Sequence, residues 1–305
     1  MRATNTEKLP QTFELTPSGS PMVIVGCIVV LVAVLVGFTM AGGHVGALIH
    51  PSEFITIGGA AFGALIVMSP KKVLVDVFKS VLQLLKGSPY NRAAYVELFK
   101  LLYVLAKLVR RDGMLALDSH ISSPKESPIF ARYPKISHNH HAMDFLLTAL
   151  GLMGDGGDSE KLLAALEEEM KVIDREHHAA VSALARTADA LPGFGIVAAV
   201  LGIVVTMEAI GGPVEEIGHK VGAALVGTFL GILMSYGFIA PMAGRMEYLG
   251  EAEMTFFRTI ASAVAAMTEG AGPSEVVARA RRVVSTDCRP THDDMKAIAQ
   301  EEVGV

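Results

Sequence analysis

Residues 21–40 read PMVIVGCIVVLVAVLVGFTM, and no Asp, Glu, Lys or Arg occurs anywhere between Glu14 and Glu53. A helix of about 20 apolar residues is long enough to cross the hydrocarbon core of a membrane. The whole chain has 305 residues, of which 51% are hydrophobic, and a mean hydropathy of +0.45. Soluble domains of this length are rarely so apolar, so the composition predicts a membrane protein.

Three more stretches without charged residues have nearly the length of a membrane span. They are residues 55–70 (ITIGGAAFGALIVMSP), residues 190–207 (ALPGFGIVAAVLGIVVTM) and residues 221–244. The first two of these are close to the minimum length, so buried core helices are the alternative interpretation for them. The placement of charges argues against that alternative, and we expect four membrane spans.

Basic residues predict which side of the membrane each loop faces. Residues 70–135 contain 12 Lys and Arg against five Asp and Glu, whereas residues 41–52 and 211–219 contain no Lys or Arg. Basic loops remain in the cytoplasm, so we expect an inner-membrane protein with both termini cytoplasmic. The expected order is a cytoplasmic tail (1–20), helices one and two (21–69), a cytoplasmic helical domain (70–190), helices three and four (191–244), and cytoplasmic C-terminal helices with a tail (245–305).

The cytoplasmic region has helical patterns and no strand pattern. Residues 97–111, ELFKLLYVLAKLVRR, carry an apolar stripe at helical spacing. The GDGGD run at residues 154–158 predicts a loop, because no GK[ST] follows it. The predicted fold class is therefore all-α.

Several functions find no support in the sequence. Two cysteines cannot form a disulfide framework, and a net charge of −5 without a long basic tract argues against nucleic-acid binding. His and Glu clusters at residues 138–141, 167–169 and 177–178 lack the spacing of metal ligands. Neither a catalytic triad nor a nucleotide-binding motif is present, so we expect neither an enzyme nor a metal protein.

Small residues recur along the last two predicted spans. Such residues allow membrane helices to approach closely, so these spans are expected to form a tight inner layer. Two interpretations stay open, which are packing within one chain and self-association into a ring. The fourth span carries them every four residues, at Ala223, Gly227, Gly231 and Ser235, and the third at Gly195, Ala198, Ala199 and Gly202.

Two prolines lie near the cytoplasmic ends of these spans. Pro192 is at the start of the third span and Pro241 is near the end of the fourth. Because the spans run in opposite directions, we expect both prolines at a similar membrane depth. Each removes a backbone hydrogen bond, so each is either a hinge or simple helix punctuation.

Ionisable residues are missing from the depth of all four predicted spans. Such residues normally mark proton or ion relays within a membrane. The polar side chains expected near the inner layer carry hydroxyl groups only, and they include Thr206 and Thr228. Thr228 lies mid-span, where its hydroxyl either lines a wet path or bonds to its own helix. If the protein conducts ions, the titrating carboxylate is expected to come from a partner.

Charged residues surround a Gly-Met-Leu turn in the cytoplasmic region. Arg110 and Arg111 precede the turn and Asp118 follows it. This group is either a solvated surface or an electrostatic docking surface for a charged partner.

Taken together, six segments resemble the MotA family of flagellar motor stator subunits, which is part of the wider MotA/TolQ/ExbB group. The segment around Val226–Pro241 is shared with the ExbB and TolQ relatives and is less specific. The segments are MAGGHVGAL (40–48), RRDGMLALD (110–118), SPKESPIFARYP (123–134), LPGFGIVAAVLG (191–202), VGTFLGILMSYGFIAP (226–241), and AGPSEVVARARR (271–282) with RPT (289–291).

This resemblance implies a working partnership. In the family, a ring of MotA-like subunits, expected to be a pentamer, surrounds two helices of MotB. MotB supplies the intramembrane aspartate and binds peptidoglycan, and ion flow drives work on the rotor protein FliG. No cofactor is implied beyond the transported ion and membrane lipid.

The same resemblance assigns roles to particular residues. Pro192 and Pro241 match the family's hinge prolines, and Arg110 and Asp118 match its rotor-facing charges, with Asp in place of the usual Glu. Ala199 stands where sodium-driven relatives tend to carry Thr, which favours protons, and Thr228 matches a threonine near the ion path. An ExbB/TolQ-like energiser of outer-membrane transport is the alternative function, and a self-contained transporter is a weaker one because it needs midplane groups of its own.

Overall fold

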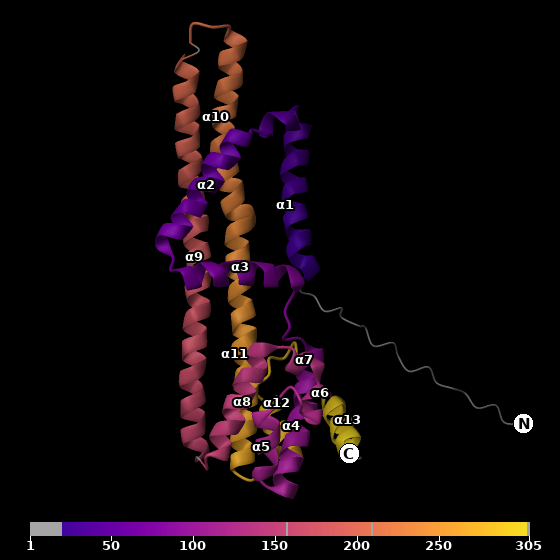
Figure 1. Cartoon of the computed structure of the whole chain (residues 1–305). Helices are drawn as coiled ribbons and strands as arrows, with labels where there is room; N and C mark the ends of the chain where they lie inside the picture. The colour runs from indigo at the N-terminus through magenta and orange to yellow at the C-terminus, as the bar shows by residue number, and fades with distance from the viewer. Residues whose placement is uncertain (1–19, 157, 209, 304–305) are drawn as a thin grey trace, which may run out of the picture.

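The computed structural model describes residues 20–156, 158–208 and 210–303. The prediction of a tail at residues 1–20 therefore lies outside the described residues, apart from Ser20. Within the described ranges every regular element is helical, which confirms the all-α fold class. Figure 1 shows one long helix pair that runs the length of the molecule, with a helical hairpin beside it at one end and a cluster of shorter helices at the other.

Among the residues that the structure describes, four helices are long and apolar enough to cross a membrane, as predicted. The first is α1 (Ser20–Met40), and a short 3-10 turn, η1 (Val45–Leu48), leads into α2 (Pro51–Met68). The other two belong to α9 (Ser159–Glu208) and α10 (Val214–Met234). Two predicted starts were too late, because α2 begins at Pro51 rather than Ile55 and α10 begins at Val214 rather than Val221.

The long pair extends far beyond a membrane. Helix α9 has 50 residues, which corresponds to about 75 Å at 1.5 Å per residue. Its neighbour α10 continues through a π-helical segment, η2 (Ser235–Ile239), into α11 (Ala240–Thr268). The predicted domain boundaries at residues 190 and 244 fall inside these continuous helices. The membrane part and the part predicted to be cytoplasmic, which we call the cytoplasmic part, therefore share two continuous helices. Movement at one end of these helices can reach the other end.

Helix α3 (Lys71–Lys86) crosses the long pair at the junction of the two parts (Figure 1). It buries Val77 and Leu84 in a small core with Ala180, Leu184 and Met246 of the long pair. Its opposite side exposes large apolar residues, Val75, Phe78, Leu82 and Leu85. An amphipathic helix of this kind, rich in Lys, is suited to the membrane interface.

The cytoplasmic part has one large core that joins both predicted cytoplasmic segments. The predicted stripe at residues 97–111 is confirmed, since Leu98, Leu101, Leu102 and Leu105 are fully buried. The rings of Phe145 and Phe257 stack with their centroids 4.6 Å apart. The contributing helices besides α9 and α11 are α4 (Arg92–Asp112), α5 (Leu115–Ser122), α6 (Pro128–Ala131), α7 (Pro134–Ser137), α8 (His140–Gly154), α12 (Pro273–Arg281) and α13 (His292–Val303).

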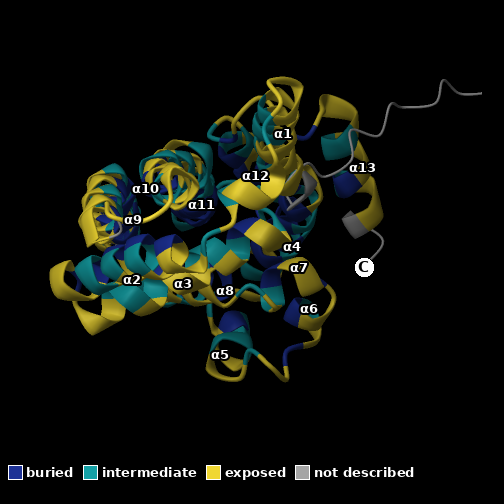
Figure 2. Ribbon diagram, turned by 90° about the horizontal axis from the view of Figure 1, so that it is seen from above, coloured by how far each residue is buried: buried dark blue, intermediate teal, exposed yellow. Residues whose placement is uncertain are grey.

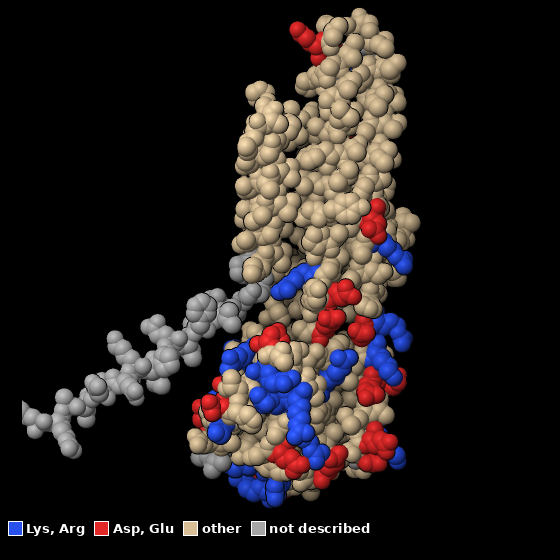
Figure 3. All heavy atoms as spheres, turned by 180° about the vertical axis from the view of Figure 1, so that it is seen from behind, with Lys and Arg blue, Asp and Glu red and all other residues tan. Residues whose placement is uncertain are grey.

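Polarity divides the molecule along its long axis. Figure 3 shows most Lys, Arg, Asp and Glu side chains over the helical cluster, while the opposite half is almost entirely uncharged. Within α1, none of the span Met22–Met40 is buried, and Figure 2 shows α1 standing apart from α9 and α10 with exposed residues around it. This helix is therefore left to contact lipid or other chains.

Candidate functional site

Helices α9 and α10 approach each other so closely that backbone atoms meet. A methyl group on Gly231 would lie 2.7 Å from the carbonyl oxygen of Leu191 and 2.9 Å from Cα of Gly195. A methyl group on Gly202 would lie 2.7 Å from Cβ of Ala224. Glycine and alanine permit this contact in a membrane. We call it the α9–α10 seam, formed by Leu191, Gly195, Ala198 and Gly202 of α9 with Ala224, Gly227, Gly231 and Ser235 of the facing helix.

Three of the four residues in the predicted stripe lie in this seam. Gly227, Gly231 and Ser235 face α9, whereas Ala223 lines a cavity toward α1 and its neighbour Ala224 meets Gly202 instead. The stripe therefore serves packing within one chain, which was one of the two interpretations. Self-association into a ring stays a prediction.

Ser235 and Pro241 belong to one local distortion of the helix. The hydroxyl of fully buried Ser235 donates a hydrogen bond to the carbonyl oxygen of Ala188 at 2.6 Å. Over residues 235–239 the bonding widens to a π pattern, in which the N–H of Ala240 donates to the carbonyl of Ser235. Proline cannot donate to the previous turn and its ring clashes there. The π segment just before Pro241 relieves that clash, and such segments often mark functional sites.

The expected common depth of the two prolines is wrong. Leu191 lies opposite Gly231 and Ala188 lies opposite Ser235, so Pro192 lies near this level. Pro192 is opposite about residue 230, so Pro241 lies about three turns further toward the cytoplasmic end, a separation on the order of 16 Å. The prediction neglected the register of the two helices. Helix α9 runs through Pro192 without a break, so the hinge roles of both prolines stay a prediction.

The predicted ion-path residues lie along the same seam. Thr206 donates its hydroxyl to the carbonyl of Gly202 at 2.7 Å, so that group bonds to its own helix. Ala199 and Thr228 are half-buried and follow directly after Ala198 and Gly227 in sequence. Because Ala198 lies against Gly227 and Gly195 lies against Thr228, the structure places Ala199 and Thr228 within about one helical turn of each other along the seam.

One expectation is contradicted, since an ionisable residue does lie within a span. Glu53 belongs to the first turn of α2 and is 8% exposed. A methyl group on Gly227 would lie 2.6 Å from Glu53 Oε2 and 3.2 Å from Cβ of Ala198, so the carboxyl group lies against the middle of the seam. Among the described residues this buried oxygen has no hydrogen-bond partner. The prediction missed Glu53 because the charge-free window was started two residues after it.

A cavity of about 520 Å³ opens near Glu53 between α1 and α10. Its wall is mostly apolar, with Phe38 and Phe229 among the lining residues, but it also includes His50 and His219. The two imidazole rings meet edge to face with their centroids 6.0 Å apart. His50 caps α2, and the N–H of Glu53 donates to its carbonyl oxygen at 3.1 Å. Nδ1 of His50 is buried without a hydrogen-bond partner in the described part of the chain.

A second buried glutamate lies in the cytoplasmic part and is fully engaged. Glu253 Oε1 accepts hydrogen bonds from the Tyr90 hydroxyl and from Nδ1 of His141 at 3.0 Å, and Nδ1 of His177 lies 3.6 Å from Oε2. Burial acts to raise the pKa of Glu253, but the bonds from His141 and Tyr90 outweigh it and hold the pKa below its usual range. The bond to Glu253 in turn raises the pKa of His141, and burial followed by the carboxylate's charge raises the pKa of Tyr90.

The predicted docking charges lie at the far cytoplasmic end of the molecule. Arg110 and Arg111 end α4, Gly113 turns the chain with a φ of 80°, and Asp118 lies in the first turn of α5. All three charged side chains are exposed. Arg111 bonds to its neighbour Asp112 at 2.8 Å, so part of its charge is compensated locally. We call Arg110, Arg111 and Asp118 the charged tip.

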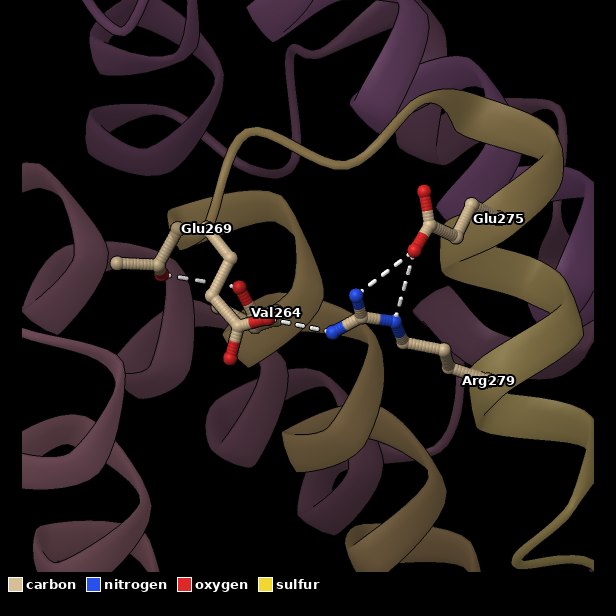
Figure 4. Close-up of polar contacts among 5 residues, drawn as sticks. Val264, Glu269, Glu275 and Arg279 are labelled. Atoms are coloured by element: carbon tan, nitrogen blue, oxygen red, sulfur yellow. Dashed lines mark hydrogen bonds and ion pairs between the residues drawn. The ribbon is translucent and has the colours of Figure 1, made fainter.

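A turn between α11 and α12 supports the charged tip. The guanidinium of Arg110 lies against Gly272, where a methyl group would come within 2.5 Å of it. Figure 4 shows how this turn is closed, because Arg279 of α12 bonds both to Glu275 of its own helix and back to Glu269 at the end of α11. The motif at residues 271–282 therefore fixes the turn on which Arg110 rests.

These features define a polytopic membrane protein in which a tight helix pair links a membrane half to an exposed charged tip. Residues 24–113 match the family model for the motility protein A N-terminal region, and residues 137–259 match the MotA/TolQ/ExbB proton channel family. The chemotaxis protein LafT of Vibrio parahaemolyticus is 38% identical over 92% of this chain and 98% of its own length. Motility protein A of Salmonella typhimurium is 34% identical over 90% of this chain and 94% of its own length.

Solved structures agree on the fold. The C. jejuni MotAB structure matches with a TM-score of 0.72 at 23% identity, covering 89% of this chain and 98% of the matched chain. The flagellar MotAB stator complex from Bacillus subtilis matches with a TM-score of 0.66, also at 23% identity, covering 90% of this chain and 98% of the matched chain. The chain therefore belongs to the motility protein A family, within the wider MotA/TolQ/ExbB proton channel family.

Proposed function

We propose that this chain, a stator subunit of the bacterial flagellar motor, conducts protons together with a MotB-type partner and turns their flow into torque. The observation that carries the proposal is the 38% identity to LafT over 92% of the chain. That alignment includes both the membrane half and the charged tip, so it covers channel and rotor functions alike. The role is that of an ion-channel subunit of the inner membrane rather than an enzyme.

The partner enters the proposal through the neighbouring structures. Both are complexes described as MotAB. A MotB-type helix would supply an intramembrane aspartate, and a ring of five copies of this chain would surround a pair of such helices. The exposed surface of α1 and the outer faces of α9 and α10 supply apolar area for these contacts. Both termini are proposed to be cytoplasmic, in keeping with the basic residues 70–135.

Protons are the proposed ion because Ala199 stands where the sodium-driven relatives tend to carry Thr. No cofactor is proposed. Swimming speed of cells that depend on this chain, measured with sodium replaced by potassium, tests the choice of ion. Unchanged speed supports protons, and arrest on sodium removal would contradict them.

The charged tip is the proposed contact with the rotor protein FliG. It is exposed, rigidly based on the α11–α12 turn, and far along the long pair from the membrane. The charge-reversed double variant Arg110→Glu/Asp118→Lys should lose torque while its membrane level stays normal, because both side chains are exposed and outside the core. Lys296→Glu on exposed α13 is the matched control and should swim normally. Full motility of the double variant would count against the docking role.

An ExbB/TolQ-like energiser is the competing function. The shared proton-channel match covers only residues 137–259, whereas the N-terminal match is specific to motility protein A and spans α1 and α2. This second match favours the stator. Deletion that leaves swimming intact and impairs outer-membrane uptake would reverse the preference.

A further inference from the structure

The feature that the function so far leaves unused is Glu53. Its carboxyl group lies against Gly227, about two-thirds of the way along α10, and therefore within the membrane half. Gly227 is needed there because a methyl group would come within 2.6 Å of the carboxyl oxygen. Helix α10 is thus shaped to admit this group.

Retention of such a group has a substantial energetic cost. Burying a carboxyl without hydrogen-bond partners is unfavourable by several kcal/mol when it is charged, and ionisable residues inside membranes are normally functional. Glu53 Oε2 has no partner in the described ranges of the chain. By contrast, the hydroxyl of Thr206 in the same helix pair donates a hydrogen bond to a carbonyl of its own helix. Glu53 is therefore equipped for proton exchange in a way that the hydroxyl groups are not.

Two histidines lie toward the outward end of the molecule from Glu53. His219 is exposed on α10, its ring touches that of His50, and His50 is one helical turn before Glu53. Both rings line the cavity of about 520 Å³, which is large enough for several waters at roughly 30 Å³ each. The groups thus form a series from exposed imidazole to half-buried imidazole to buried carboxyl.

Other titratable groups on the packed elements are few. Helix α10 adds exposed Glu215 and the Glu216–Lys220 ion pair, 3.1 Å between Oε1 and Nζ. Glu208 ends α9, and exposed His44 precedes η1. Residues 20–40 of α1 contain no ionisable side chain except Cys27. His50 and Glu53 are therefore the groups that join the outward face to the level of Ala199 and Thr228.

We propose that Glu53 is a proton-binding residue of this subunit, located in the outer half of the ion path and loaded through His219 and His50. This rests on the proposed proton-driven function. At each step a proton breaks its bond to one oxygen or nitrogen and binds a lone pair of the next group: water to His219, His219 to His50, and His50 to Glu53 Oε2. The last transfer runs through intervening water, because neither His50 Nδ1 nor Glu53 Oε2 has a hydrogen-bond partner among the described residues. Glu53 then releases it at the level of Ala199 and Thr228 toward the partner's carboxyl. No electrons move, and one proton travels inward in the net step.

Proton flux through the intact complex with its MotB-type partner, in vesicles whose content of both subunits is quantified, tests the proposal. Glu53→Gln keeps the size of the side chain but cannot exchange a proton, so flux should fall on the order of tenfold or more. Glu53→Asp should retain flux within about threefold of wild type. Glu215→Gln, at an exposed site near the outer end of α10, is the control and should match wild type.

The outcomes separate this proposal from the proposed function. Wild-type vesicles that carry no proton flux would overturn the proton-driven function itself. Normal wild-type flux with an equal flux in Glu53→Gln would overturn only the role of Glu53. If Glu53→Gln does not accumulate in the membrane, His219→Gln decides, because that side chain is exposed. A lowered flux that depends on external pH supports the relay, and an unchanged flux at every external pH contradicts it.

Discussion

Among the described residues, the membrane half and the cytoplasmic half each bury one glutamate, and the surroundings of the two differ sharply. Glu253 lies in a core of large aromatic and aliphatic side chains and is bonded by Tyr90 and His141. Glu53 lies against glycine and alanine and finds no hydrogen-bond partner within the described ranges. A buried polar group with all its partners stabilises a fold, whereas one without them has to be explained by function.

The same contrast extends to the packing of the two halves. The cytoplasmic half joins seven helices with parts of α9 and α11 around one core, which gives it a firm base for the charged tip. In the membrane half, α1 is unburied, whereas the α9–α10 seam is tightly packed and α2 buries Ile57 and Ala61 against it. We infer that the cytoplasmic half acts as a rigid lever, and that the membrane half leaves room for ions and for other chains.

The largest effect is expected from filling the seam. Gly231→Ala places a methyl group 2.7 Å from a backbone oxygen and 2.9 Å from a backbone carbon, which the helices can relieve only by separating. The expected cost is about 3 kcal/mol, and the larger side chain of Gly231→Leu should prevent accumulation in the membrane. Gly222→Ala is the control, because nothing lies within 4 Å of its added methyl group. Equal membrane levels of Gly231→Leu and wild type would show that the seam is not the main contact of this half.

Removing the charge of Glu253 should have the next largest effect. Glu253→Gln keeps the shape but loses the charged acceptor of Tyr90 and His141, so the free energy of unfolding should fall by about 1.5–3 kcal/mol. Thermal unfolding of the purified complex measures this. Exposed Glu251, two residues away, provides the control Glu251→Gln. Proton flux per assembled complex should stay normal in Glu253→Gln, in contrast to Glu53→Gln. A loss of flux in Glu253→Gln would show that Glu253 is not purely structural.

A smaller effect should appear as a pH dependence. The pKa of His141 is raised, so its contribution to stability is complete below its ordinary value of 6.5 and is lost as the pH rises through the raised value. The pKa of Glu253 is lowered, so its contribution is present above 4.5 and is lost as the pH falls through the lowered value. The bond between His141 and Glu253 therefore stabilises the fold most between pH 4.5 and pH 6.5, the ordinary pKa values of the two groups. His141 keeps 70% of its side chain exposed, so water screens the bond and the effect is modest.

The measurement is the difference in unfolding midpoint between wild type and His141→Gln across this range. The difference should be greatest inside the window and should shrink at higher pH. A difference that grows at alkaline pH would show that neutral His141 is the stabilising form.

The smallest effect is expected at the exposed ion pairs of Figure 4. Arg279 bonds to Glu269 and Glu275 at the surface, and exposed pairs contribute little to stability. Arg279→Met should leave the unfolding midpoint unchanged. It should still loosen the turn beneath Arg110, which a slower swimming speed at a normal membrane level would report. A large drop in the midpoint would mean that this turn belongs to the structural core.

Patterns in sequence captured the parts of the fold that depend on local composition. Charge-free length located four spans, and helical spacing located the buried face of α4. Gly227, Gly231 and Ser235 were found because small residues at a four-residue spacing have few other uses in a membrane. The charged tip was located by the charges that flank a Gly-Met-Leu turn, at which Gly113 has a positive φ of 80°. Its rotor-facing role came only from the family resemblance.

Properties that depend on the register between two helices could not be predicted from the sequence. The depth of Pro192 relative to Pro241 follows from which residues of α9 and α10 face each other, and no pattern within either helix contains that information. Glu53 was missed because a window without charges cannot include a buried charge, although it lies in the first turn after a proline that can start a helix. The π segment before Pro241 and the partners of Glu253 likewise depend on contacts between segments far apart in the chain.

The most direct test of the central claim is motility in a strain that lacks this chain, complemented with wild type or with Pro192→Ala or Pro241→Ala. If the chain is a stator subunit whose two prolines act as hinges, wild type should restore swimming, and each proline variant should reach a normal membrane level but fail to restore it. In Pro241→Ala the proline ring no longer clashes with the preceding turn, so residues 235–239 should return to α-helical hydrogen bonding. Deletion that leaves swimming intact while impairing uptake of iron or vitamins would contradict the account.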